Sequence, residues 1–570
     1  MTNKICGCLL MLLLCFTGLN AQSVMQPLNP DFYYLLDRFE VKSGRMATGF
    51  HSSVKPFERK GVAELADSLW KHPNDSAAAL SAIDRDDISW IQHDNSEWTQ
   101  NDSVNHSRRN LGYFYRRPAD AIHYSDSNFD LHASPVFLFQ YGKTNDINTP
   151  SHQGNPIVNT RGAEVRGMIA KKVGFYSYFS DNQVLMPAYT DTYNKGMMPG
   201  EGFWKRYKLG GYDYLSARGY FTFSAAKFIH FRAGYDKNTV GNGYRSLILS
   251  DFSNAYAFLE INTRVWKLNY RNLFARLNYD VPYDYQGVQA GNLLPVKFMA
   301  MHHLSMNIGS RLNIGLFESI IFARNSVSQK SGNSFDFSYV NPIIFYRYAE
   351  SNNGSPDNVN VGTDFKLNLF RHISLYGQVV LDEFLLKEIK AGNGWWGNKQ
   401  AAQIGIKYYD AAGIKNLDLQ AEYNYVRPFT YSHINNSTSY TNYNMPLAHP
   451  YGANFREVVG ILRYRPIKRL YITAKGIYCK QGMSVTGSLV GEDPTVSYAG
   501  RSAEYGFTTG GGVPRKILYA DLTASYRIRH NLFVDLKQVI RNQTTDGAEM
   551  NTTFSSLSLR LNIAQKVQEY

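Results

Sequence analysis

Charged residues are scarce in this sequence: they make up 19% of its 570 residues, below the roughly 25% of ordinary soluble domains. Beyond the N-terminal segment there is no apolar run long enough for a membrane helix, which excludes a bundle of membrane-spanning helices. Aromatic residues reach 14%, too many for a disordered chain. Two classes remain. One is a large soluble β protein, and the other is a transmembrane β-barrel, whose strands alternate in polarity.

Cysteine is also rare, and its placement is informative. Three of the 4 cysteines lie in residues 1–21, where Lys4 precedes the apolar run 5–16 and Ala21 offers a small residue for cleavage. This segment predicts a secretory signal peptide. Cys479 is then alone, so we expect no internal disulfide and no cysteine metal site in the secreted chain. The net charge of +13 suggests contact with anionic surfaces or ligands.

The pattern of the chain changes once, and we place the boundary between 22–130 and 131–570. The first part is mixed and polar, with weak helical patterns at 58–71 and 76–90, the latter with Asp75 as a candidate N-cap. We therefore expect a small, partly helical periplasmic region ahead of the main domain.

In the second part, apolar and polar residues alternate with period two. Within 517–529, Leu518 and Leu522 fall on one face, and Asp521 and Thr523 fall on the other. Such runs reach the roughly 9–11 residues that a tilted strand needs to cross a bilayer, whereas strands of soluble proteins are usually about 5–6 residues long. The expected fold class is all-β: a transmembrane antiparallel β-barrel.

Eighteen strands can be placed from this alternation. They lie near 133–141, 157–169, 173–181, 213–224, 228–236, 256–263, 268–280, 295–307, 311–323, 357–369, 373–384, 400–409, 415–427, 454–465, 468–480, 517–529, 531–541 and 553–565. Short turns and long loops join them in alternation, as in outer-membrane barrels with short periplasmic turns and long external loops. An even count predicts both termini in the periplasm, and backbone hydrogen bonding requires closure. We expect 340–346 to belong to an external loop that folds inward.

The same alternation assigns side chains to the lumen, where basic residues outnumber acidic ones. The candidate lumen cations include Arg218, Arg232, Arg276, Arg527 and Arg560. Two interpretations stay open: a network of ion pairs that fills the lumen, or a path for anionic solutes. Glu318 falls on the lipid face near the end of its strand, which indicates an error of register or an interfacial position.

The predicted external loops are rich in aromatic, amide and hydroxyl side chains. Rigid aromatic faces beside polar groups suit sugar rings, because a few such anchors can dominate binding. The candidate glycan-binding residues are Trp395, Trp396, Trp204, Tyr431, Tyr440 and Tyr443. The alternative is that these rings pack the loops together or belong to the aromatic girdle at the membrane interface.

Motifs of catalysis are missing: there is no phosphate-binding glycine loop, GxSxG, HExxH or cysteine pair. His302 and His303 are adjacent on a strand, so their side chains point to opposite faces and cannot chelate one metal together. We expect no enzyme activity, no cofactor, no metal site and no nucleic-acid partner.

Four stretches carry a family resemblance: 37–44 (DRFEVKSG), 240–254 (VGNGYRSLILSDFSN), 396–399 (WGNK) and 447–455 (LAHPYGANF). They resemble the gliding-motility RemB-like outer-membrane proteins of Bacteroidetes, themselves similar to the capsule-assembly Wzi family. The resemblance implies an eighteen-stranded barrel with a helical periplasmic part and a lectin-like role without catalysis, or a role in gliding. The chain departs from the usual outer-membrane end signal, because a short tail follows the last strand.

Together these observations predict an outer-membrane barrel that binds or organises surface polysaccharide. The expected partners are outer-membrane lipid, surface polysaccharide and gliding or export machinery. The alternative is an outer-membrane channel selective for small anionic solutes.

Overall fold

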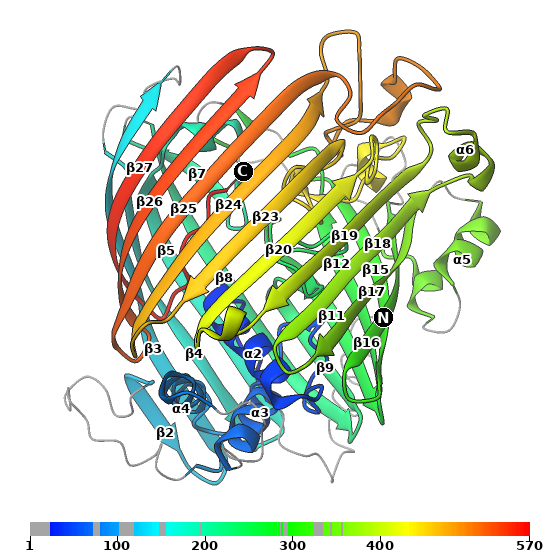
Figure 1. Cartoon of the computed structure of the whole chain (residues 1–570). Helices are drawn as coiled ribbons and strands as arrows, with labels where there is room; N and C mark the ends of the chain where they lie inside the picture. The colour runs from blue at the N-terminus through cyan, green and yellow to red at the C-terminus, as the bar shows by residue number, and fades with distance from the viewer. Residues whose placement is uncertain are drawn as a thin grey trace.

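The computed structural model describes residues 23–71, 80–101, 119–147, 155–193, 197–208, 210–281, 283–284, 287–288, 294–323, 334–341, 345–354 and 357–569, so the predicted signal peptide lies outside them. The chain forms a closed barrel of 18 antiparallel strands, in which the last strand pairs with the first (Figure 1). The predicted fold class and strand number are confirmed.

Each barrel strand lies close to its predicted position. The strands are β3 (Phe129–Ile147), β4 (Ile157–Ile169), β5 (Val173–Leu185), β8 (Gly211–Ala226), β9 (Ile229–Asp236), β11 (Tyr256–Val265), β12 (Leu268–Asn278), β15 (Val296–Ile308), β16 (Leu312–Phe322), β17 (Asn358–Leu369), β18 (Ile373–Glu383), β19 (Lys399–Tyr408), β20 (Leu417–Val426), β23 (Phe455–Tyr464), β24 (Leu470–Met483), β25 (Val513–Arg529), β26 (Leu532–Thr545) and β27 (Ala548–Leu561). Short additional strands lie in the connections: β1 (Val54–Lys55), β2 (Ile122–Ser125), β6 (Met197–Met198), β7 (Gly202–Tyr207), β10 (Thr239–Val240), β13 (Tyr283–Asp284), β14 (Gly287–Val288), β21 (Thr441–Asn442) and β22 (Met445–Pro446).

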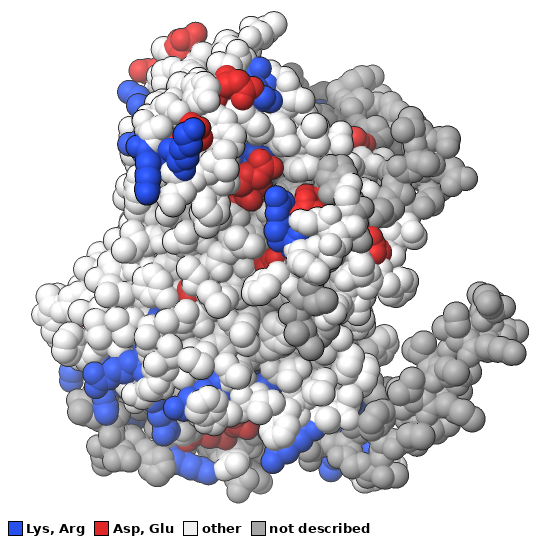
Figure 2. Space-filling model, turned by 90° about the vertical axis from the view of Figure 1, so that its right-hand side faces the viewer, with Lys and Arg blue, Asp and Glu red and all other residues white. Residues whose placement is uncertain are grey.

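Tight turns join the strands at one end of the barrel. Lys171, Trp266, Gly309 and Arg371 all have positive φ, as two-residue hairpin turns require. All four were predicted as short turns. Figure 2 shows an almost charge-free band on one face of the barrel above a row of Lys and Arg side chains at this short-turn end. Such a band is what a lipid-facing wall requires.

Alternation assigned most side chains to the correct face. Leu522 is 53% exposed on the outer wall and Thr523 is 3% exposed in the lumen. The prediction for Arg276 is wrong, because this residue is exposed on the outer wall. Arg271 and Arg276 have opposite parity in β12, so only one can face the lumen. Arg271 does so, 2.8 Å from Glu260.

The loop that contains 340–346 does not fold inward, and that prediction is wrong. Its described parts, including α5 (Tyr346–Asn353), lie outside the barrel (Figure 1). Tyr346 packs in one cluster with outward-facing Phe274 and Ile320 of the wall. Glu318 accepts a hydrogen bond of 3.1 Å from the backbone N–H of Arg347 and so caps the first turn of α5. The acid on the outer wall is therefore a helix cap rather than an error of register.

Three helices, α2 (Pro30–Ser43), α3 (Arg59–Lys71) and α4 (Ala82–Asp94), lie at the short-turn end (Figure 1). The second agrees with the predicted helix at 58–71. The third begins later than predicted: its N-cap is Ser81, which forms a capping box with Asp84, and Asp75 lies outside the described residues. The first was not predicted, although Asn29 caps it and Pro30 begins it.

Within the described residues the remaining helical segments are α6 (Leu386–Ala391), in a loop at the end opposite the short turns, and several short 3-10 turns. No helix within the described ranges is long and apolar enough to cross a membrane.

Candidate functional site

Helix α2 anchors the N-terminal helices to the barrel through buried ion pairs. Arg38 lies 2.6 Å from Asp410 and 3.1 Å from Asp84, and it also pairs with Asp418. Lys42 lies 2.8 Å from both Asp84 and Asp410. Burial alone would raise the pKa of Asp84, but Arg38 and Lys42 outweigh it and hold that pKa well below its usual range. At neutral pH the Asp84 carboxylate is therefore charged.

The opposite side of α2 carries acids that meet lumen lysines. Asp37 pairs with Lys366 and Lys407, and Glu40 lies 2.5 Å from Lys366. The helix ends at Gly44, whose φ of 72° is the left-handed conformation of a C-cap. The stretch 37–44, which carries the family resemblance, is thus the surface that docks the N-terminal region into the barrel.

A long connection, 237–255, fills the middle of the lumen. Its strand β10 pairs with β1 of the N-terminal region. The backbone N–H groups of Tyr244 and Arg245 both donate to the carboxylate of Glu422, and Arg245 pairs with Glu457 at 3.3 Å. The second stretch of the family resemblance therefore lies inside the barrel.

The C-terminal tail also enters the lumen. The last strand ends at the short-turn end as predicted, but residues 562–569 turn back inside the barrel (Figure 1). Glu569 is fully buried, where it pairs with Lys475 and lies 3.4 Å from Arg245. Lys566 pairs with Glu201 at 2.8 Å. Residues 562–569 thus pack in the lumen rather than extending from the mouth at the short-turn end.

Four of the five predicted lumen arginines, all except Arg276, point inward and are engaged by ion pairs or aromatic rings. Arg232 lies 2.7 Å from Glu260, and Arg560 lies 2.8 Å from Asp535. Arg527 pairs with Asp86 of the N-terminal region. Arg218 stacks over the ring of Tyr178 at 4.6 Å, and Arg232 and Arg560 also lie over aromatic rings. This geometry fits the interpretation as an ion-pair network that fills the lumen.

Cavities with room for several waters remain between these filling segments. Those around the start of α2 have volumes of about 200, 160 and 90 Å³. A water molecule occupies about 30 Å³ in the liquid, so each cavity holds a few waters.

At the opposite end, three long loops meet: 384–398, 427–454 and 484–512. The backbone N–H of Trp396 donates to the carbonyl of Glu504 at 3.1 Å, and that of Phe507 donates to Gly394 at 2.9 Å. The middle loop joins them, because the N–H of Phe429 donates to Gly491 at 2.8 Å. We call this assembly the loop cluster.

Trp396 packs at the centre of the loop cluster. Its ring lies 4.6 Å from that of Tyr498, and the guanidinium of Arg501 lies 4.2 Å above it. Its indole N–H donates to the carboxylate of Glu504 at 2.8 Å. Burial raises the pKa of Tyr498 to about 12, and the negative charge of Glu383 adds to this effect, so the Tyr498 hydroxyl stays protonated. Through these contacts, Trp396 holds loop 384–398 against loop 484–512.

Trp395 is the other ring of the pair and, like Trp396, is partly exposed. Its ring centre lies 5.8 Å from that of Trp396. The ring lies over Gly397, where an added Cβ would come within 2.4 Å of it. Within the described parts of the chain, its indole N–H has no hydrogen-bond acceptor. A flat ring, an available donor and a glycine beneath it suit stacking against a sugar.

The other predicted aromatic residues have partners outside the tryptophan pair. Tyr431 and Tyr440 are buried, and their hydroxyls donate to backbone carbonyls of the lumen segment at 2.7 and 2.8 Å. Trp204 is buried against Tyr212 at a ring distance of 4.7 Å, and Tyr443 contacts Phe203 at 5.6 Å. The structure therefore brings together Trp395 and Trp396 and separates them from the rest.

Sequence reasoning missed the residues that complete the loop cluster. Tyr498 and Arg501 lie in the loop 484–512, where no periodic pattern links them to Trp396. Lys399 begins β19, and its ammonium lies 4.2 Å from the ring centre of Tyr498. Lys399 belongs to the WGNK stretch that carries the family resemblance. No pattern in the sequence, however, indicates that Lys399 lies over the ring of Tyr498.

No family model and no curated protein matches this sequence. Among solved structures, the chain is similar to Wzi of Escherichia coli, an outer-membrane protein involved in group 1 capsule assembly and described as a carbohydrate-binding β-barrel. The TM-score is 0.54 at 11% identity, and the match covers 96% of this chain and 100% of that one. OprD of Pseudomonas aeruginosa gives a TM-score of 0.39 at 12% identity, covering 76% and 96%, too distant to argue from. At this identity the likeness to Wzi establishes the fold.

Proposed function

We propose that this chain is an outer-membrane β-barrel that binds or organises surface polysaccharide through its loop cluster, without catalysis. In this proposal the long loops face the exterior, while the short turns and the N-terminal helices face the periplasm. Outer-membrane lipid and surface polysaccharide are its partners. The RemB-like resemblance adds gliding or export machinery as a further partner.

The observation that carries the proposal is the Trp395 ring. It stands partly exposed on a loop cluster that is held together by Trp396, Tyr498 and Arg501. A pre-organised aromatic surface binds with little loss of conformational entropy, because its loops are already ordered. The Wzi-like fold supports the same interpretation, since the solved Wzi structure is described as a carbohydrate-binding barrel.

The experiment is a glycan array of bacterial surface polysaccharides with the purified full-length barrel. Wild-type protein should bind a subset of the glycans, and Trp395→Ala should lose that binding by at least tenfold. Barrel assembly should be unchanged, as judged by heat-modifiable gel mobility. The physical reason is that the ring is an accessible anchor and supports little else.

Trp396→Ala is the matched comparison. Because this ring packs against Tyr498 and Arg501, its loss should loosen the loop cluster and raise the protease sensitivity of 484–512. Trp395→Ala should leave protease sensitivity at the wild-type level. Wild-type binding by Trp395→Ala would remove this ring from the proposal, and no glycan binding by the wild type would contradict the proposal itself.

A further inference from the structure

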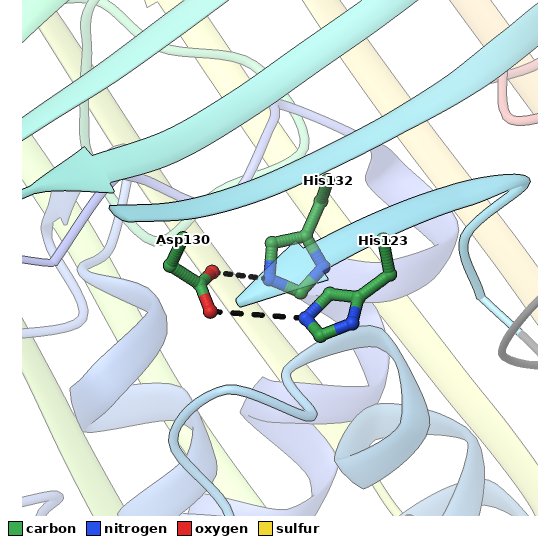
Figure 3. Close-up of side chains that lie close together, drawn as sticks. All are labelled: His123, Asp130 and His132. Carbon is green, nitrogen blue, oxygen red and sulfur yellow. Dashed lines mark ion pairs between the residues drawn. The ribbon is translucent and has the colours of Figure 1, made fainter. Parts of the chain in front are cut away.

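A histidine–aspartate cluster lies on the hairpin of β2 and β3 at the short-turn end of the barrel. His123 and His132 are directly opposite each other in the antiparallel pairing, and their ring centres lie 4.6 Å apart. Asp130 precedes His132 by two residues, so its side chain lies on the same face of the strand. Figure 3 shows the carboxylate of Asp130 turned toward both rings.

The distances suit a shared metal ion. The Nε2 atom of His132 lies 2.7 Å from Oδ1 of Asp130, and Nε2 of His123 lies 3.7 Å from Oδ2 of Asp130. One ligand atom from each residue fits within a 4.8 Å span. Tetrahedral zinc with ligands at about 2.0–2.1 Å places them roughly 3.3 Å apart. The two observed distances, one to each oxygen of Asp130, lie on either side of that value.

His132 is oriented as a metal ligand requires. Its Nδ1 lies 2.7 Å from Oδ2 of Asp120, whose side chain is completely buried. When Nδ1 donates its proton to that carboxylate, the lone pair of Nε2 is directed toward Asp130.

Nε2 of His132 and Oδ1 of Asp130 face each other at 2.7 Å, a separation that either a shared proton or a shared metal ion can bridge. The side chain of His132 is 1% exposed, so water cannot readily solvate it. Both atoms are acceptors in this tautomer, and a cation between them satisfies both.

We propose that His123, Asp130 and His132 bind a divalent transition-metal ion of the zinc class, and that Asp120 is the positioning residue for His132. Two imidazoles and one carboxylate suit Zn²⁺, Cu²⁺ or Ni²⁺ rather than Ca²⁺ or Mg²⁺, which take oxygen ligands. Asp120 also lies 3.4 Å from Arg166, which reaches Glu97 at 3.3 Å. The metal thereby joins the hairpin to the segment that follows α4.

The test uses the full-length barrel purified without a histidine tag, stripped with EDTA and then dialysed. Titration with Zn²⁺ by calorimetry should give one ion per chain, and Co²⁺ should give the visible absorption of a tetrahedral site. His123→Asn and Asp130→Asn should each weaken Zn²⁺ binding at least 100-fold. Asp120→Asn should weaken it by about 10–100-fold, as expected for a residue that orients a ligand.

The control variant is His93→Asn on α4. In the wild type the rings of His93 and His530 lie 6.0 Å apart, so this pair is the alternative place where Zn²⁺ could bind. The control variant should bind Zn²⁺ like the wild type. Heat-modifiable mobility should show that all variants form the barrel. Substitution of His123 should disturb the fold less than substitution of His132, because the His123 side chain is 10% exposed. Loss of binding in His93→Asn, or equal binding by wild type and His123→Asn, overturns the proposal. Displacement of Zn²⁺ by equimolar Ca²⁺ also overturns it.

Discussion

At the scale of single residues, the side of the wall that a side chain faces sets the effect of its substitution. Leu522 is 53% exposed on the outer wall, and its neighbour Thr523 is 3% exposed in the lumen. Leu522→Arg places a charge in lipid at a cost of about 2–4 kcal/mol, so barrel folding should fall. Thr523→Arg should be tolerated much better, because polar groups line the lumen. Folding yield and heat-modifiable mobility measure both, and equal effects would mean that the faces are misassigned.

Protonation of His51 at low pH should weaken the docking of the N-terminal region to the barrel. The Nδ1 atom of His51 lies 2.7 Å from the hydroxyl of Ser305. Burial, then Arg264 and His303, lowers the pKa of His51 to about 4, while Asp364 opposes the shift. An unfolded histidine has a pKa of about 6.5, so the folded state loses stability as the pH falls from there to about 4. The shift corresponds to about 3 kcal/mol.

Hydrogen exchange of residues 30–71 at pH 7.0 and pH 4.5 measures this loosening. After normalisation to the intrinsic amide exchange rate, which is much lower at pH 4.5, exchange in the wild type should accelerate at the lower pH. His51→Gln retains a hydrogen-bonding side chain without a titratable group, and it should reduce the acceleration. An acceleration of the same size in His51→Gln would assign the pH effect to other groups.

At the scale of elements, α2 determines whether the N-terminal region stays docked. Arg38 is fully buried among Asp84, Asp410 and Asp418. Arg38→Ala leaves buried carboxylates without their cation, which costs about 3–5 kcal/mol. Protease should then cleave the N-terminal region while the barrel keeps its heat-modifiable mobility. Arg45 is exposed near the end of the same helix, and Arg45→Ala should behave like the wild type. Equal protection of Arg38→Ala would show that these ion pairs do not hold the docking.

The elements differ in how far the sequence predicted them. Strands between lipid and lumen alternate because each has one apolar and one polar side, so their positions followed from the residues. Segment 237–255 and the C-terminal tail are surrounded by polar lumen groups, and no periodic pattern marks that environment. The sequence contains one local signal for the position of α5, the acidic Glu318 on the outer wall. An acid on this face is unexpected from alternation alone, and it is explained by its hydrogen bond to the first turn of α5. In the loop cluster, the tryptophan pair was identified from sequence, but Tyr498 and Arg501 come from a distant loop.

At the scale of the whole molecule, several segments fill the lumen. The N-terminal helices dock at the short-turn end, while 237–255 and 562–569 lie inside. In planar bilayers the purified protein should therefore conduct at least tenfold less than an open porin of similar strand number measured beside it. Steady conductance at the level of the open porin would favour the channel for anionic solutes instead.

The most direct test of the account is to measure how polysaccharide divides between the surface of intact cells and the medium. A strain that lacks this gene is complemented with the wild type or with Trp395→Ala, and surface-bound and released polysaccharide are quantified and sized. The account predicts that Trp395→Ala shifts polysaccharide from the cell surface to the medium at unchanged chain length, with equal amounts of folded barrel. Unchanged retention would contradict polysaccharide binding at this ring, and a change in chain length would contradict a function without catalysis.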